Sequence, residues 1–183
     1  MKKIKISILG LGYIGLPLAI KLAQFYETTG FDININRINE LKKNIDRTKE
    51  VTKKDFKKKL KIDFTSDINE IKESNFYIIT VPSPIKKNKT PDFQPLIKAC
   101  DILSKVIKRG DICVFESTVY PGATEEVLIP RLEKKSDYKL NEDFFVGYSP
   151  ERANPGDKIR KLENITKVIS ANREISLKVG TQI

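Results

Sequence analysis

The 183-residue sequence contains no histidine and no tryptophan, one methionine and two cysteines. Without histidine, a His-ligated zinc or haem site and a Ser-His or Cys-His catalytic pair are excluded within these residues. The two cysteines lack CxxC spacing and form no disulfide framework. No apolar run reaches the roughly 18 residues of a membrane span, and the N-terminal apolar run has no signal-peptide cleavage site. We therefore expect one soluble, cytoplasmic domain with no metal site and no membrane partner.

Positive charge is concentrated in one segment. The chain has 34 Lys+Arg against 24 Asp+Glu, a net charge of +10, and residues 42–61 alone have a net charge of +7. Thr52 and Asp55 predict a capping box that opens a short helix, with Phe56 and Leu60 as its buried stripe. A lysine-rich run of this kind is typical of a solvated helix face. A nucleic-acid footprint is the alternative, but we expect no nucleic-acid partner.

Strand-like and helix-like segments alternate along the chain. Gly110 follows the third helix-like segment, where a C-cap glycine belongs. The alternation predicts an α/β fold, a Rossmann-type doubly wound and mainly parallel sheet with helices on both faces. The expected strands are residues 4–9, 28–33, 76–81, 112–115, 144–148 and 167–169, and the expected helices are residues 16–23, 38–45, 96–107 and 124–132.

A glycine motif follows the first expected strand. Residues 10–15 read GLGYIG, in which Gly10 permits a tight turn, Gly12 lets the backbone approach a pyrophosphate, and Gly15 lets the next helix pack on the strand. The N-terminus of that helix offers N–H donors and a positive dipole to the anion. Asp32, 22 residues after Gly10, is placed to accept hydrogen bonds from the adenosine ribose and to repel a 2′-phosphate. The motif therefore favours NAD over NADP, although Arg37 is of the type that holds the extra phosphate of NADP.

Three later loops contain hydroxyl or charged side chains beside prolines. Residues 80–84 read TVPSP, residues 116–122 read ESTVYPG and residues 148–152 read YSPER. Ordinary turn chemistry explains each loop taken singly, because these residue types populate any loop. All three follow expected parallel strands, whose carboxyl ends meet at the edge of the sheet where ligands bind. Together the loops predict a site at that edge.

Five motifs, in their order and spacing, resemble the UDP-glucose/GDP-mannose dehydrogenase family. Within it they are most similar to the N-terminal domain of UDP-N-acetylhexosamine 6-dehydrogenases of bacterial surface-polysaccharide pathways, such as those of capsule and O-antigen. The resemblance covers essentially the whole chain. It implies oxidation of a sugar C6 alcohol to a carboxylate, with two NAD+ per substrate and a covalent thioester on a cysteine. The motifs are GLGYIGLPLA, FDININRI, ITVPSPI, ESTVYPGATEE and GYSPERANPGDK.

The resemblance also implies a role for each matching residue. Glu151 corresponds to the catalytic glutamate, which acts on the water that hydrolyses the thioester, and burial beside an apolar nicotinamide would raise its pKa toward that of a useful base. Thr118 can hold a water molecule or the substrate hydroxyl, and is grouped with Glu151 as catalytic. Glu151, Arg152 and Ala153 correspond to residues that line the sugar-nucleotide site. The implied cofactor-binding residues are Gly10, Gly12, Tyr13, Ile14 and Gly15 at the pyrophosphate, Asp32 and Arg37 at the adenosine, and Ser83 and Thr118 at the nicotinamide half.

Some family features are altered or missing. Ser83 stands where threonine is usual, Ala153 replaces a larger aliphatic residue, and residues 170–171 read SA where many members have a glycine. The family's nucleophilic cysteine, its catalytic lysine and asparagine, and its dimer-forming central helix are absent from these residues. Cys100 and Cys113 lie in apolar segments and are expected in the core rather than as substitute nucleophiles.

We therefore expect residues 1–183 to be the NAD-binding, N-terminal part of a longer nucleotide-sugar dehydrogenase, and to bind NAD without turnover. The intact enzyme is expected to be a homodimer or higher homo-oligomer acting on UDP-GlcNAc or UDP-GalNAc. UDP-glucose and UDP-N-acetylmannosamine are the alternative substrates. A non-catalytic NAD-binding module is the alternative of another class, because a fold does not dictate a function.

Overall fold

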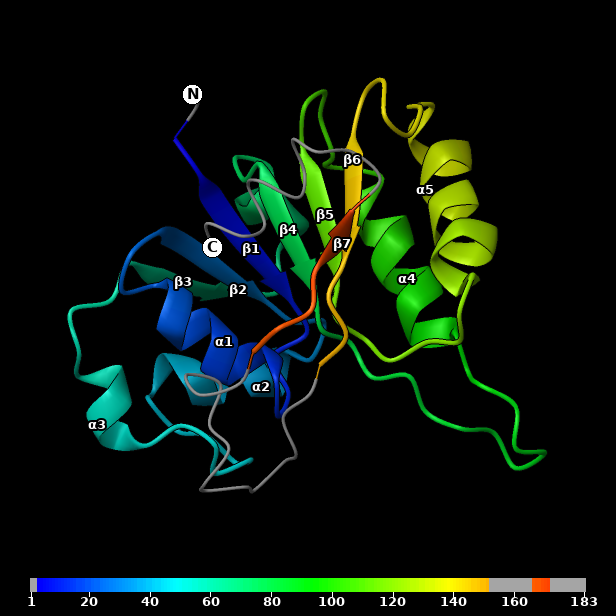
Figure 1. The fold of residues 1–183 in the computed structure, drawn as a ribbon. Helices are drawn as coiled ribbons and strands as arrows, with labels where there is room; N and C mark the ends of the chain where they lie inside the picture. The colour runs from blue at the N-terminus through cyan, green and yellow to red at the C-terminus, as the bar shows by residue number, and fades with distance from the viewer. Residues whose placement is uncertain (1–2, 152–165, 172–183) are drawn as a thin grey trace.

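The computed structural model describes residues 3–151 and 166–171. They form one seven-stranded sheet with the strand order β3-β2-β1-β4-β5-β6-β7 (Figure 1). Strands β1 to β6 run parallel, and β7 pairs antiparallel with β6. The strands are β1 (Lys5–Leu9), β2 (Glu27–Phe31), β3 (Ile62–Thr65), β4 (Phe76–Ile79), β5 (Ile112–Phe115), β6 (Phe145–Tyr148) and β7 (Ser170–Ala171).

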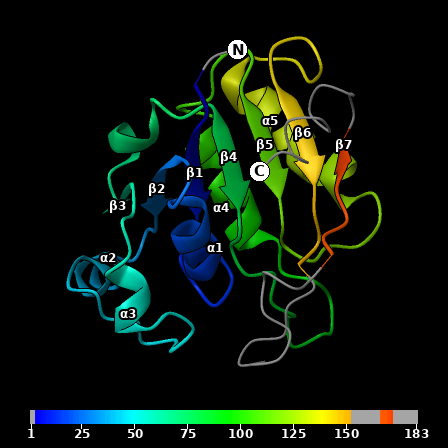
Figure 2. The same ribbon diagram turned by 60° about the vertical axis from the view of Figure 1, so that its left-hand side comes forward.

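Helices cover both faces of the sheet, as Figures 1 and 2 show, with α1 and α2 on one side and α4 and α5 on the other. This arrangement confirms the predicted doubly wound α/β fold. No helix among the described residues is long and apolar enough to cross a membrane. The helical elements are α1 (Gly15–Leu22), α2 (Ile35–Lys42), α3 (Lys53–Phe56), the 3-10 turn η1 (Ile68–Ile71), α4 (Gln94–Leu103), the π-helical turn η2 (Thr124–Leu128) and α5 (Ile129–Ser136).

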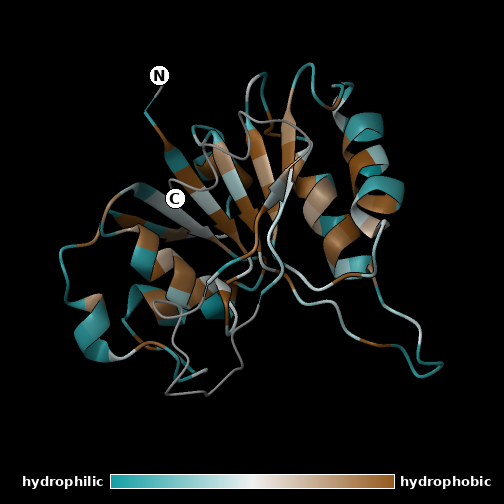
Figure 3. Ribbon diagram, in the orientation of Figure 1, coloured by the Kyte–Doolittle hydropathy of each residue, from teal (hydrophilic) through white to brown (hydrophobic). Residues whose placement is uncertain are grey.

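The central strands are buried on both faces, which explains their almost uninterrupted apolar sequence. Successive side chains of a strand point to opposite faces. In β4, Phe76 and Ile78 pack in the core on the α1 side, whereas Tyr77 and Ile79 pack in the core on the α4 side. Figure 3 shows the resulting band of hydrophobic strands between the helices. The sheet is therefore packed between two hydrophobic cores, one on each face.

Several strand predictions differ from the structure. The strands expected at residues 28–33 and 76–81 end earlier, at Phe31 and Ile79. Strand β3 was not expected, because it directly follows a lysine-rich segment and only Phe64 and Thr65 of its four residues are buried. The last strand was expected at residues 167–169, but Ser170 and Ala171 form it, opposite Tyr148 and Gly147. The apolar side chains at 168 and 169 suggested the earlier position, whereas the antiparallel pairing with β6 determines the strand.

Several helix boundaries also differ. The predicted capping box is confirmed, since Thr52 Oγ1 accepts from the Asp55 N–H and the Asp55 carboxylate accepts from the Thr52 N–H. However, α3 ends at Phe56, so Leu60 lies beyond the helix and does not continue its stripe. The helix expected to reach residue 45 ends at Lys42, and Ile45 is 48% exposed.

The other two expected helices are shifted at their C-terminal ends. Helix α4 ends at Leu103 rather than at residue 107, and Gly110, with φ +89°, lies in the later turn before β5. The helix expected over residues 124–132 begins as the π-helical turn η2 and continues through α5 to Ser136. There Asp137, in the left-handed region, ends it without a glycine.

Candidate functional site

The carboxyl end of β1 lies where the strand order reverses. From β1 the chain enters α1 on one face, whereas from β4, the other neighbour of β1, it reaches α4 on the opposite face. In open α/β sheets such a switch point forms the ligand-binding crevice. Thr80, just after β4, donates its hydroxyl to Gly10 O at 2.7 Å and lies 3.1 Å from Leu9 O. Thr80 lies in the loop 80–84 that the sequence places at this edge, but the sequence assigns it no individual role.

The three glycines of the motif meet different surroundings. Gly10 has φ +97°, a left-handed conformation that favours glycine. A Cβ added to Gly15 would lie 1.8 Å from Gly10 O and 2.4 Å from Thr80 Oγ1, so only glycine allows α1 to begin so close to β1. A Cβ added to Gly12 would meet no atom within 4 Å. The first and third glycines therefore serve the fold, while the second faces open space of the kind a pyrophosphate would fill.

Helix α1 begins directly after the glycine loop, where the Leu16 N–H donates to Gly12 O at 3.3 Å and the Leu18 N–H donates to Ile14 O at 3.1 Å. Its N-cap residue, Ile14, makes no side-chain capping bond, and the first turn contains no acidic residue. The first N–H groups of a helix lack partners inside the helix and carry a partial positive charge. The positive end of the helix dipole favours an anion here. The glycine loop and the start of α1 thus fit the pyrophosphate of a dinucleotide.

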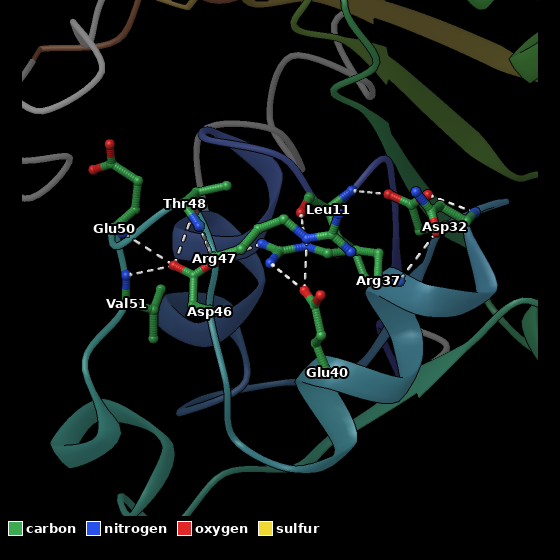
Figure 4. Close-up of polar contacts among 10 residues, drawn as sticks. Leu11, Asp32, Arg37, Glu40, Asp46, Arg47, Thr48, Glu50 and Val51 are labelled. Carbon is green, nitrogen blue, oxygen red and sulfur yellow. Dashed lines mark hydrogen bonds and ion pairs between the residues drawn. The ribbon is translucent and has the colours of Figure 1, made fainter.

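Asp32 follows β2 and is fixed beside the glycine loop. Its Oδ2 accepts from the Leu11 N–H at 2.8 Å, and its Oδ1 accepts from the Asn34 N–H at 2.9 Å (Figure 4). The carboxylate is only partly buried. Asp32 therefore lies beside the glycine loop, at the carboxyl end of β2.

Arg37 is buried in an ion pair. Its Nε donates to Leu11 O and its Nη2 to Asp46 Oδ1, both at 2.8 Å, and only 5% of the residue is exposed (Figure 4). Nη1 lies 3.8 Å from Glu40 Oε2. The guanidinium is therefore committed to the loop that follows α2, and it supports the glycine loop through Leu11. This arrangement disfavours the alternative in which Arg37 holds the phosphate of NADP.

Asp46 organises the loop that receives Arg37. Burial would raise the pKa of the Asp46 carboxyl, but hydrogen bonds from the Val51 N–H, Thr48 and Arg37 outweigh burial and hold that pKa below its ordinary value. A further bond comes from the Glu50 N–H. This local network was not predicted, because residues 43–51 contain no motif that signals it.

Side-chain hydroxyls tie together the loops after β4 and β5. Ser83 donates to Thr118 O at 2.7 Å, and Ser117 donates to Val81 O at 2.5 Å. The structure thus brings Ser83 and Thr118 together at the carboxyl edge, on the side of the switch point occupied by β4 and β5. The Thr118 side chain itself is exposed.

Glu151 follows β6 and joins a partly buried charged cluster. Its N–H donates to Glu116 O at 3.1 Å, and its side chain is 11% exposed, so it is not a solvated loop carboxylate. Lys167 Nζ lies 2.6 Å from Glu116 Oε1 and 3.3 Å from Glu151 Oε2. Sequence reasoning assigned no role to Glu116 or Lys167. Arg152 and Ala153 lie outside the described residues.

Both cysteines are core residues, as predicted. Cys100 on α4 and Cys113 on β5 are fully buried. Burial raises the pKa of the Cys100 thiol to about 12 and that of the Cys113 thiol well above its usual value. Since the thiolate is the nucleophile, neither residue can serve as one here.

The switch point at the carboxyl end of β1, the glycine loop and Asp32 define a dinucleotide-binding Rossmann domain. The chain belongs to the UDP-glucose/GDP-mannose dehydrogenase family, and residues 4–183 match the NAD-binding domain of that family. This match confirms the family suggested by the sequence motifs and identifies NAD as the cofactor.

Known relatives resemble the chain over one part of their length. A UDP-N-acetyl-D-glucosamine 6-dehydrogenase of Salmonella typhi is 52% identical over 170 residues, which cover 93% of this chain and 40% of that protein. Protein CapL of Staphylococcus aureus is 53% identical over 165 residues, which cover 90% of this chain and 39% of that protein. A solved NDP-N-acetyl-D-galactosaminuronic acid dehydrogenase from Methanosarcina mazei superposes with a TM-score of 0.89 at 30% identity, covering 99% of this chain and 42% of that one. The chain thus spans about 40% of the length of these relatives.

Proposed function

We propose that the chain is the NAD-binding part of a longer nucleotide-sugar 6-dehydrogenase. The enzyme would oxidise the C6 hydroxyl of a UDP-N-acetylhexosamine, UDP-GlcNAc or UDP-GalNAc, to the uronic acid for surface-polysaccharide synthesis. The observation that carries the proposal is the space in front of Gly12, which faces the uncapped start of α1 in a domain of this family. The choice of sugar is supported by the 52% identity to a UDP-N-acetyl-D-glucosamine 6-dehydrogenase.

The cofactor would lie across the carboxyl edge of the sheet. The backbone of the glycine loop and the N-terminus of α1 would hold its pyrophosphate, together with Tyr13 and Ile14. Asp32 would accept hydrogen bonds from the adenosine ribose. Arg37 would support the site indirectly, because its hydrogen bond to Leu11 O fixes the glycine loop. Ser83 and Thr118 would flank the nicotinamide half. When bound, NAD supplies the acceptor for the hydride that leaves the sugar C6.

The catalytic roles fall on the loops after β5 and β6. Thr118, exposed at this edge, would hold the substrate hydroxyl or a water molecule without adding a charge. Glu151 would take a proton from the water that hydrolyses the thioester, since its carboxylate is mostly buried at the end of β6. Together with Glu151, Arg152 and Ala153 would line the sugar-nucleotide site. The nucleophilic cysteine would come from the remainder of the longer protein.

The proposed enzyme would work in the cytoplasm as a homodimer or higher homo-oligomer, without a nucleic-acid or membrane partner. UDP-glucose and UDP-N-acetylmannosamine remain the competing substrates. A non-catalytic NAD-binding module is the second candidate function, favoured by the fact that no reactive thiol lies among the described residues.

Two measurements test the proposal. Calorimetric titration of the 183-residue chain should show NAD+ binding and much weaker NADP+ binding, and equal affinities would mean that Asp32 does not select the cofactor. The complete reading frame should then be expressed and assayed for NADH formation against UDP-GlcNAc, UDP-GalNAc, UDP-glucose and UDP-N-acetylmannosamine. Two NADH per UDP-GlcNAc or UDP-GalNAc would support the proposal. A reading frame that ends at Ile183 would favour the non-catalytic module, and turnover of UDP-glucose alone would refute the proposed substrate.

A further inference from the structure

Three charged side chains from distant parts of the chain meet at the carboxyl edge of the sheet. Glu116 follows β5, Glu151 follows β6, and Lys167 precedes β7. We call these three residues the Glu-Lys-Glu cluster. The side chains of Glu116, Glu151 and Lys167 are 6%, 11% and 21% exposed, so water screens their charges poorly.

The fold itself brings Lys167 to this place. Strand β7 pairs antiparallel with β6, with Ser170 opposite Tyr148, and this pairing carries the preceding residues back along the end of β6, where Glu151 lies. The backbone bond from the Glu151 N–H to Glu116 O holds the two glutamates side by side. Lys167 Nζ lies between their carboxylates, at 2.6 Å from one and 3.3 Å from the other.

The charges of the cluster do not balance when all three groups are ionised. Two carboxylates then share one ammonium, and Glu116 Oε2 has no hydrogen-bond partner in the part of the chain that the structure describes. Burial raises the pKa of Glu116, and the neighbouring Glu151 adds to that rise, while Lys167 opposes it. Two carboxylates that share a site release their last proton at a higher pH than one carboxylate paired with a cation.

We propose that Lys167 is a positioning residue for Glu151, with Glu116 as the buried counter-ion that holds the Lys167 ammonium in place. The inference rests on the proposed catalytic role of Glu151. The shorter contact anchors Lys167 to Glu116, and the longer one orients the Glu151 carboxylate. When Glu151 takes up a proton, the cluster loses one negative charge and the ammonium stays paired with Glu116. Glu151 can therefore gain and lose a proton without leaving a partly buried lysine unpaired, a state that would be costly.

The test is a carboxyl carbon NMR titration of the 183-residue chain, with Glu116→Gln and Glu151→Gln used to assign the signals. The key variants are Lys167→Met, which removes the cation and keeps the length, and Glu116→Gln, which removes one carboxylate. Lys167→Met should raise the pH of the last carboxyl titration in the cluster, and Glu116→Gln should lower it. We expect each shift to be about one pH unit, a tenfold change in proton affinity. Lys167→Arg should restore most of the parent behaviour.

Controls separate positioning from structural support. Lys86→Met, an exposed lysine outside the cluster, should leave the titration unchanged. A lysine with only a structural role would lower Tm when replaced, and Lys167→Met and Glu116→Gln would not shift the titration in opposite directions. Shifts in the same direction, or none, would overturn the inference. If Lys167→Met does not fold, Glu116→Gln and Lys167→Arg still decide it.

The titration is independent of the proposed function. The NMR measurement uses neither cofactor nor substrate, so opposite shifts with no turnover by the longer protein would count against the dehydrogenase and not against the cluster. Conversely, turnover by the longer protein together with unshifted titrations in the variants would support the dehydrogenase and refute a positioning role for Lys167.

Discussion

Replacing Gly12 and Gly15 by alanine, one at a time, separates binding from folding. A Cβ at Gly12 would meet no atom within 4 Å, and its backbone is not in the left-handed region, so Gly12→Ala should not strain the fold. The same methyl group at Gly15 would lie 1.8 Å from a backbone oxygen, which no side-chain movement can relieve. One identical change therefore tests two different roles of one motif.

The two substitutions are expected to change different quantities, NAD+ affinity for Gly12→Ala and stability for Gly15→Ala. Gly12→Ala should raise the free energy of unfolding slightly, by about 0.4–1 kcal/mol, because alanine restricts the unfolded chain. Its methyl group would occupy the space of the pyrophosphate, and we expect NAD+ to bind about 100-fold more weakly, a loss of ~2.8 kcal/mol. Gly15→Ala should cost about 3 kcal/mol or more through overpacking. For a chain of this size, such a loss lowers Tm by roughly 6–12 °C.

The assay combines thermal unfolding by circular dichroism with calorimetric titration of NAD+ for the parent and both variants. The reasoning is refuted if Gly12→Ala binds NAD+ as tightly as the parent, since the pyrophosphate could not then lie against this loop. A Gly12→Ala variant with a strongly lowered Tm would refute the distinction between the two glycines. An unchanged Tm for Gly15→Ala would also refute this distinction.

Three further predictions concern the supporting structure. Asp46→Asn removes the nearer counter-ion of the buried Arg37 and should lower the free energy of unfolding in urea by about 3 kcal/mol. Because the pKa of Asp46 is depressed in the fold, the parent should lose this stability as the pH falls below about 4, whereas Asp46→Asn should not show that loss. Cys100 and Cys113 should react with a thiol reagent only after unfolding, and labelling of the native chain would contradict their burial. Thr52→Ala should lower stability by about 1 kcal/mol through loss of the helix cap, and Thr52→Ser should restore it.

The sequence was sufficient for those parts of the site that depend on local spacing. The glycine motif places its turn, its close approach and its helix start within six consecutive residues, so its geometry follows from the chain itself. Asp32 was predictable for a similar reason, because one helix and one strand separate it from the motif. The central strands were likewise recognisable in the sequence, because strands that are buried on both faces are almost uninterruptedly apolar.

The missed features depend on contacts between distant segments. Lys167 reaches Glu116 only because β7 turns back along β6, and two residues of strand give no recognisable pattern. Arg37 could be expected near the adenosine, but its partner Asp46 lies in a loop without a motif. Strand β3 was missed because the lysines before it indicated a solvated helix for the whole segment.

The position of β3 at the edge of the sheet suggests a role for the lysines that precede it. β3 is the last strand on its side of the sheet, and such a strand presents unpaired N–H and C=O groups that can recruit another chain. Four of the five residues at 57–61, which lead directly into β3, are lysines. We infer that their like charges repel a second copy approaching this edge. The excess of basic residues would thus oppose aggregation at the side of the sheet that no helix or strand closes within residues 3–151 and 166–171.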